Sequence, residues 1–115
     1  MKVMLRTTVK IVPGKMAEYM EIEAKSQAME SRCGMPPRRS YSPLTGDSMH
    51  KIIYYMEFDS LAALETSFEK MLADPERQEI MAKYEGTIVS HENDLCIPKL
   101  QNVLGIAEAP MVEGL

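Results

Sequence analysis

The chain has few residues that are able to bind a metal or form a disulfide. Its 115 residues include two cysteines, Cys33 and Cys96, and two histidines, His50 and His91. The cysteines stand far apart and outside any C-x-x-C spacing, and the histidines are equally separate, so the sequence predicts no metal site. Two lone thiols fit a reducing compartment, and we therefore expect a cytoplasmic protein.

Basic charge and long apolar runs are also missing. The net charge is −4, which argues against a nucleic-acid partner. No apolar run approaches the roughly 18 residues of a membrane span, so we expect no membrane partner. The chain contains no P-loop, G-x-G-x-x-G or H-E-x-x-H motif, and we expect no cofactor.

The order in which hydrophobic periodicity changes is what predicts the fold. Alternating runs cover residues 2–12, 37–44 and 49–58, helical runs cover 15–33 and 61–84, and a last apolar run lies at 87–89. This order predicts an α+β, ferredoxin-like βαββαβ unit, a four-stranded antiparallel sheet with its helices on one face. We expect one domain over residues 1–98. Residues 99–115 form a C-terminal tail, expected either to pack on a partner subunit or to fray.

The two faces of the predicted sheet carry different side chains. In the first strand Leu5, Thr7 and Val9 share the face that we expect under the helices. The third strand, however, has large apolar side chains on both faces, which predicts that its second face is covered as well. The charged residues expected on that second face, clustered between two sheets, are Arg6, Lys10, Arg38, Arg39, Lys51 and Glu57.

The helical runs suggest a cleft between helices and sheet. Small residues, Ala24 and Ala28, thin the apolar stripe of the first helix, which predicts either close packing or a gap that a ligand fills. Asp74-Pro75 should interrupt the second helical run, because proline removes a backbone donor. The predicted ligand-binding residues of an open cleft are Thr7, Met20, Ala24, Tyr54, Phe68, Met81 and Tyr84.

Several motifs resemble one family of proteins. These are the V-x-I-x-P-G-K-x-x-E-Y run of residues 9–19, the strand-to-helix block of residues 52–61, and Ala73-Asp74-Pro75-Glu76. Over residues 2–98 the chain is similar to the dimeric α+β barrel superfamily and to its NIPSNAP-like branch, related to antibiotic-biosynthesis monooxygenase-like domains. The resemblance implies a homodimer in which two bare sheet faces pack together. We expect that face to include Met4, Thr8, Ile53 and Tyr55.

The resemblance leaves two hypotheses for function. The first is an uncharacterised NIPSNAP-like small-molecule-binding or accessory protein, which works as a homodimer. The alternative is a cofactor-independent monooxygenase or cyclase acting on an aromatic or polyketide-like substrate, with His91, Tyr54 or Tyr84 in acid–base roles. The haem-degrading branch fits poorly, because the chain has no tryptophan and carries Thr7 where that branch typically has asparagine.

The cleft should discriminate between the two hypotheses. A packed cleft favours an accessory protein, whereas a cavity of several hundred Å³ with convergent polar groups favours an enzyme. Its predicted lining is apolar with a few hydroxyl groups, which suits a small apolar or aromatic ligand. His50 stands beside the predicted turn at Thr45-Gly46-Asp47, so we expect it in solvent and regard His91 as the stronger candidate.

Overall fold

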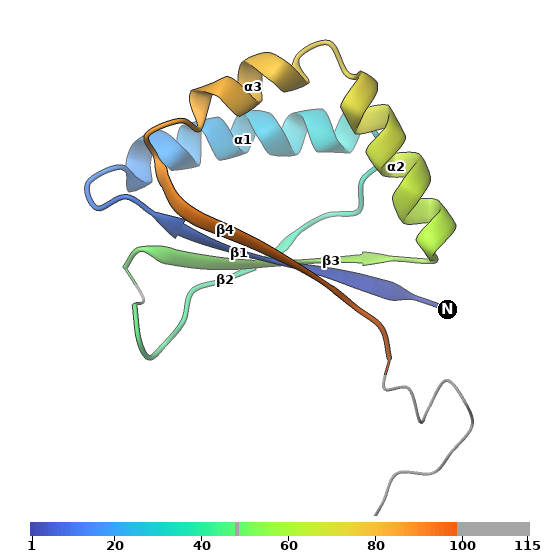
Figure 1. Cartoon of the computed structure of the whole chain (residues 1–115), viewed down its shortest axis with the longest axis horizontal. Coiled ribbons are helices and arrows are strands. Elements are labelled where there is room, and N and C mark those ends of the chain that lie inside the picture. The colour runs from blue at the N-terminus through green and yellow to red at the C-terminus, as the bar shows by residue number, and fades with distance from the viewer. Residues whose placement is uncertain (48, 99–115) are drawn as a thin grey trace, which may run out of the picture.

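The predicted order of elements is confirmed by the computed structural model, which describes residues 1–47 and 49–98 (Figure 1). None of the helices in this part of the chain is long and apolar enough to cross a membrane. The predicted tail, 99–115, lies outside the described residues. The elements are β1 (Val3–Ile11), α1 (Met16–Arg32), β2 (Arg39–Tyr41), β3 (Lys51–Phe58), α2 (Leu61–Ala73), α3 (Arg77–Lys83) and β4 (Ile88–Cys96).

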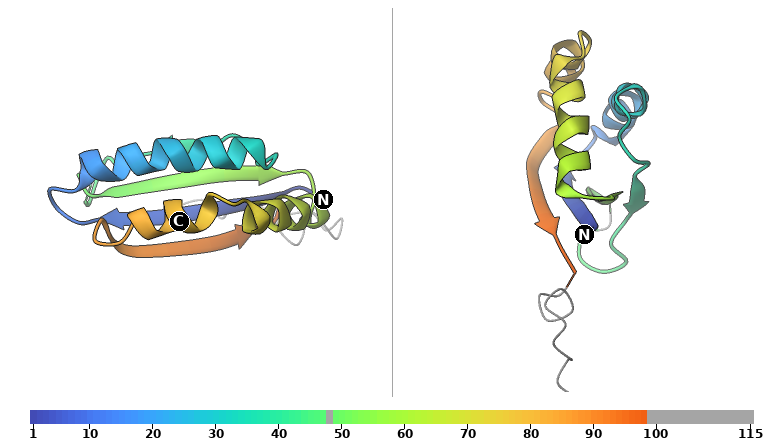
Figure 2. Two further views of the ribbon diagram at one scale, coloured as in Figure 1. Left: turned by 90° about the horizontal axis from the view of Figure 1, so that it is seen from above. Right: turned by 90° about the vertical axis from the view of Figure 1, so that its right-hand side faces the viewer.

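The strands form an antiparallel sheet in the order β2-β3-β1-β4. All three helices lie over one face of it, and the other face is bare (Figures 1 and 2). The register places Thr7 of β1 between Tyr54 of β3 and Asn93 of β4 on the helix-covered face. Thr8 and Ile53 pair on the opposite face. The predicted α+β, ferredoxin-like fold is therefore confirmed.

Two strand lengths differ from the prediction. β2 covers only Arg39–Tyr41, because Pro36, Pro37 and Pro43 on either side lack the N–H that a strand ladder needs. β4 continues to Cys96, well beyond the apolar run that predicted it. It is an edge strand whose side chains are mostly exposed, so its polar residues contribute no apolar periodicity even though its backbone pairs with β1 over most of its length.

The second helical run is broken where the sequence predicted. Ser60 caps α2, because its Oγ accepts the Ala63 N–H at 3.0 Å. At the end of α2 the Asp74 side chain accepts the Glu76 N–H at 3.0 Å, and Pro75 separates α2 from α3. α3 ends before Gly86, whose φ of +82° favours glycine and turns the chain into β4.

The predicted inward stripe of α1 is wrong at Met20, Ala24 and Ala28. Ala24 and Ala28 are exposed, and the buried face of the helix has different members, which are Tyr19, Ile22, Glu23, Ser26, Met29 and Glu30. These positions follow the i, i+3, i+4, i+7 spacing of one helix face. The prediction failed because it treated glutamate as an outward residue, whereas here two glutamates face the interior.

The apolar core of the described residues consists of two clusters. One packs Val3, Ile22, Met56 and Phe58 with other residues beneath α1 and α2. The other comprises Val9, Ile11, Tyr19 and Tyr54, near the start of α1. Tyr84, at the end of α3, packs against both clusters. The site described next is lined by members of both.

Candidate functional site

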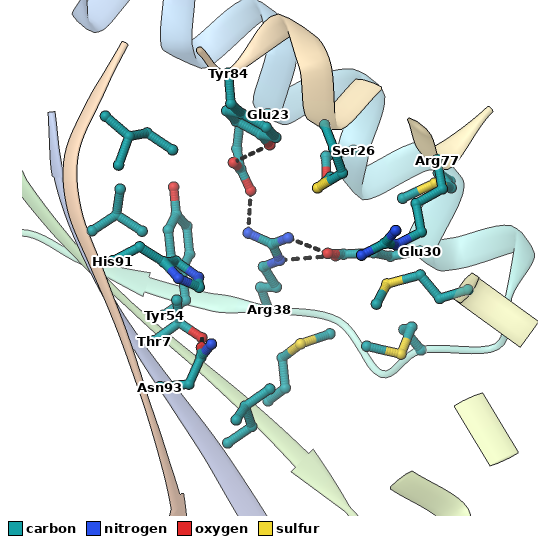
Figure 3. Close-up of a pocket in the computed structure, with 18 of the residues that line it drawn as sticks. Thr7, Glu23, Ser26, Glu30, Arg38, Tyr54, Arg77, Tyr84, His91 and Asn93 are labelled. Atoms are coloured by element: carbon teal, nitrogen blue, oxygen red, sulfur yellow. Dashed lines mark hydrogen bonds and ion pairs between the residues drawn. The ribbon is translucent and has the colours of Figure 1, made fainter. Parts of the chain in front are cut away.

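A cavity of about 610 Å³ lies between the sheet and the three helices. Its walls are largely apolar, and polar side chains enter it from α1, from the segment before β2, and from β4 (Figure 3). Methionine is unbranched and adapts its shape, so a wall rich in it can fit ligands of different outline. Five methionines contribute to the lining, namely Met29, Met35, Met56, Met71 and Met81.

A buried ion cluster forms one side of the cavity. The Arg38 guanidinium lies between the carboxylates of Glu23 and Glu30, with ion pairs to both. Its Nε donates to Glu30 Oε2 at 2.8 Å. The three side chains are nearly inaccessible, at 14%, 3% and 10% exposure for Arg38, Glu23 and Glu30. Burial this deep needs such pairing, because an isolated charge is costly in an apolar interior.

The turn after α1 brings Arg38 back to this helix. Gly34 has a φ of +75°, a conformation that glycine adopts readily, and the Met35 N–H donates to the Glu30 carbonyl at 3.0 Å. The chain then passes below α1, and Arg38 is the last residue before β2. The expected position of Arg38 between two sheets is therefore wrong. Its neighbour Arg39 pairs with Tyr55 and lies on the bare face of the sheet. Because successive side chains along a strand point to opposite faces, Arg38 lies on the helix-covered side.

Three tyrosine hydroxyls extend the cluster. Tyr84 donates to Glu23 Oε2 at 2.8 Å, and Tyr19 and Tyr54 share a hydrogen bond of 2.8 Å. The Arg38 guanidinium carbon lies 4.9 Å from the centre of the Tyr54 ring, a cation–π contact. Burial raises the pKa of Tyr54 to about 12. Burial also raises the pKa of Tyr19 and of Tyr84, so all three are neutral hydrogen-bonding groups near pH 7.

The strand β4 supplies a second polar group. Thr7 Oγ1 donates to Asn93 Oδ1 at 2.7 Å, across the β1–β4 pair. His91, two residues before Asn93 and opposite Val9, lines the cavity from the same face. The cavity therefore has an ion cluster on the α1 side and a threonine–asparagine pair with an imidazole on the β4 side (Figure 3).

The predicted site residues fall into two groups. Thr7, Phe68 and Met81 line the cavity, and so do Tyr54, Tyr84 and His91. Met20 and Ala24 do not, because the face of α1 that carries them points outward, and Met20 is 49% exposed. His50 lies beside the turn, where its Nδ1 is 3.0 Å from the Asp47 carboxylate.

Sequence reasoning missed the ion cluster and a further cation, Arg77, which lines the cavity from the start of α3. The spacing of Glu23 and Glu30 was the available clue. Two carboxylates seven residues apart lie on one helix face, and this face also carries Ile22 and Met29. The partner of these glutamates could not be found, since nothing local places Arg38 beneath the helix.

The described residues contain no group of three or more histidine, cysteine, aspartate or glutamate side chains arranged to hold a metal ion. The carboxylates of Glu23 and Glu30 are occupied by Arg38 and Tyr84. The polar side chains that line the cavity offer hydrogen bonds and groups able to transfer protons.

The NIPSNAP family model matches residues 5–100 of the chain. The chain belongs to the NIPSNAP family. The motifs that carry the resemblance coincide with structural features of this NIPSNAP domain: the block of residues 52–61 forms β3 and the Ser60 cap, and Asp74-Pro75 separates α2 from α3. No curated protein matches the chain.

Solved structures share the fold. A NIPSNAP family protein from Agrobacterium tumefaciens is 19% identical, with a TM-score of 0.73 over 86% of this chain and 87% of that one. An uncharacterized NIPSNAP-like domain protein from Burkholderia xenovorans is 15% identical, with a TM-score of 0.71 over 86% of each chain. A mutant of SnoaB, a cofactor-independent oxygenase from Streptomyces nogalater, is 14% identical, with a TM-score of 0.64 over 85% of this chain and 93% of that one.

Proposed function

We propose that this NIPSNAP domain binds a flat, mainly apolar small molecule in the cavity between its sheet and its helices. The cavity itself carries the proposal. Its volume of about 610 Å³ lies within the roughly 300–1,000 Å³ usual for small-molecule sites. Adaptable methionines and Phe68 cover much of its wall, and polar groups stand on two sides of it, as expected for a site that buries a ring system and orients it.

A pair of phenylalanine substitutions on α1 tests this proposal. Ser26 is buried and faces the cavity, so Ser26→Phe should fill part of it. Ala24, two residues earlier, lies on the exposed face of the same helix, which makes Ala24→Phe the matched control. Titration with phenylnaphthylamine, a neutral apolar fluorophore, should show saturable binding to the wild type and to Ala24→Phe and much weaker binding to Ser26→Phe. Equal binding to both variants would refute the proposal.

A second candidate is a cofactor-independent oxygenase or cyclase acting on an aromatic or polyketide-like substrate. An open cavity with convergent polar groups favours an enzyme over an accessory protein. The fold of SnoaB is compatible with this candidate. In it His91 would be the base, since the hydroxyls of Tyr54 and Tyr84 keep their protons near pH 7 and are poor proton acceptors.

The oxygenase candidate has a direct assay. An anthrone that loses its methylene hydrogens to oxygen gives a quinone and water, consuming one O₂ per molecule. Oxygen uptake and quinone absorbance with no added cofactor would support the candidate if both fall strongly in His91→Ala. Saturable binding of the anthrone without oxygen uptake would contradict the oxygenase candidate and support a protein that only binds its ligand.

We also propose that the protein works as a homodimer in the cytoplasm. Ile53, Tyr55 and Tyr41 stand together on the bare sheet face, with the two tyrosine rings 5.6 Å apart. Tyr41 is 51% exposed, and covering this face would remove such surface from water. Cys33 and Cys96 are both free thiols, which supports a reducing compartment.

A further inference from the structure

The charged groups of the cavity differ in how well they are paired. In the part of the chain that the structure describes, Arg38 forms the cavity's ion pairs, with Glu23 and Glu30. Arg77 also lines the cavity, but takes part in no ion pair among these residues, and its Nε is buried with no hydrogen-bond partner. Figure 3 shows its side chain reaching from α3 toward the ion cluster. Arg77 therefore has a hydrogen-bond donor, its Nε–H, that a ligand could engage.

A buried donor without a partner is unfavourable, because its hydration is lost and nothing replaces it. The surroundings of Arg77 strengthen this effect: the neighbouring wall, contributed by α2 and α3, contains Phe68, Met71 and Met81. Glu30 does not relieve the effect, since its carboxylate pairs with Arg38 and forms no ion pair with Arg77 in the described part of the chain. A ligand that brings an acceptor oxygen to Arg77 gains a charge-assisted hydrogen bond.

The charge balance of the cavity favours a neutral acceptor over an anionic one. The cavity contains two carboxylates, Glu23 and Glu30, and two guanidinium groups, Arg38 and Arg77, so its formal charges cancel. A ligand carboxylate would give the cavity as a whole a net negative charge, close to Glu30, and burying a net charge is costly. A carbonyl oxygen supplies the missing acceptor and adds no net charge.

We propose that the cavity selects a neutral aromatic ketone or quinone, and that Arg77 binds the carbonyl oxygen of this ligand while the methionine-rich wall holds its rings. This inference rests on the proposed binding function and names the ligand class. Arg77 acts as the specificity-determining residue. The ion cluster of Arg38 forms a fixed wall beside it, because each nitrogen of its guanidinium already donates to Glu23 or Glu30.

Three related naphthalenes test the inference. Prodan is a neutral naphthyl ketone whose emission moves to longer wavelength when its carbonyl accepts a hydrogen bond. Dimethylaminonaphthalene lacks the carbonyl, and the corresponding naphthalene carboxylate replaces it with an anion. For the wild type we expect Prodan to bind about tenfold more tightly than the other two, the value of one hydrogen bond to a charged group. Bound Prodan should also emit at longer wavelength from the wild type than from Arg77→Met.

Arg77→Met keeps an apolar side chain at the site and removes the donor. It should lower Prodan affinity about tenfold and leave dimethylaminonaphthalene within twofold, whereas Lys25→Met, on the exposed face of α1, should change neither. The ligand-free Arg77→Met protein should unfold at the same or a higher temperature. A lower unfolding temperature, or failure to fold, would overturn the inference by showing that Arg77 already has a structural partner.

The remaining outcomes separate this inference from the proposed function. If Prodan and dimethylaminonaphthalene bind equally well and Arg77→Met changes neither, the cavity binds ligands but Arg77 does not select them. If the carboxylate binds most tightly, the choice of a neutral ligand is wrong. If none of the three binds, the proposed function fails and the ligand class fails with it.

Discussion

At the scale of single residues, the unusual feature is a guanidinium held between two carboxylates in an apolar interior. Substituting one charged side chain of such a cluster lowers the stability of the fold by more than the intact cluster adds to it, since the remaining charges stay buried without a partner. Arg38 is the shared partner of both Glu23 and Glu30, so the stability of the whole cluster depends on it.

Arg38→Met should therefore lower the free energy of unfolding by about 3 kcal/mol, measured by urea denaturation. The control is Lys83→Met, which breaks the exposed pair with Glu79 and should cost less than about 1 kcal/mol. Adding Glu23→Gln and Glu30→Gln to Arg38→Met should restore much of the lost free energy of unfolding, because it removes the two buried charges that have no partner. Equal costs for the two single variants would contradict a structural role for the cluster.

The buried tyrosines predict how stability responds to alkaline pH. Tyr54 has a pKa of about 12 in the folded protein, against an ordinary value of 10.0, because burial disfavours the phenolate. The contribution of Tyr54 to the free energy of unfolding is complete below pH 10. It is lost as the pH rises toward 12, at about 1.4 kcal/mol per pH unit. Urea denaturation across this range should show a shallower decline in Tyr54→Phe. An unchanged slope in Tyr54→Phe would count against its burial.

At the scale of secondary structure, the cap of α2 gives a local prediction. Ser60→Ala should lower the free energy of unfolding by about 1 kcal/mol, because the Ala63 N–H loses its acceptor. Thr66→Ala is the control in the same helix. Its hydroxyl donates to the Ala62 carbonyl, which the helix ladder already satisfies, so chemical denaturation should show little change or a small gain. A Ser60→Ala protein as stable as the wild type would show that the cap contributes nothing.

The elements show what could be predicted from sequence. The βαββαβ order, the cap at Ser60 and the break at Asp74-Pro75 were all predictable, because each depends on local periodicity or on the chemistry of one or two residues. The full length of β4 was not, since an edge strand whose side chains are exposed on both faces has no alternating apolar pattern. Backbone pairing with β1 holds it in place.

The lining of the cavity was predicted for the sheet and for the second helical run, which supplies Phe68, Met81 and Tyr84. Strand alternation correctly placed Thr7 and Tyr54 on the helix-covered face. The α1 residues were misplaced, because an apolar stripe was sought on a helix whose buried face includes charge. Arg77 was missed for a related reason: an arginine at the start of an amphipathic helix gives no sign that it turns inward.

At the scale of the whole molecule, the bare sheet face predicts the state of association. The wild type should sediment as a dimer at micromolar concentration, with an interface above roughly 2,000 Å² as in obligate dimers. Ile53→Arg should produce monomers, because it would bury an unpaired charge in the interface. Met20→Arg, on the exposed face of α1, should remain dimeric. A wild type that sediments as a folded monomer at this concentration would refute the dimer.

The central claim is that the cavity binds a flat apolar molecule, and methionine-methyl NMR tests it most directly. The methyl groups of Met29, Met35, Met56, Met71 and Met81 line the cavity, whereas Met20 and Met49 are exposed. Titration of the methyl-labelled protein with phenylnaphthylamine should shift the five cavity methyl signals together, in a saturable manner, and leave those of Met20 and Met49 unchanged. Shifts confined to the exposed methionines, or no saturable shift in the five, would contradict the account.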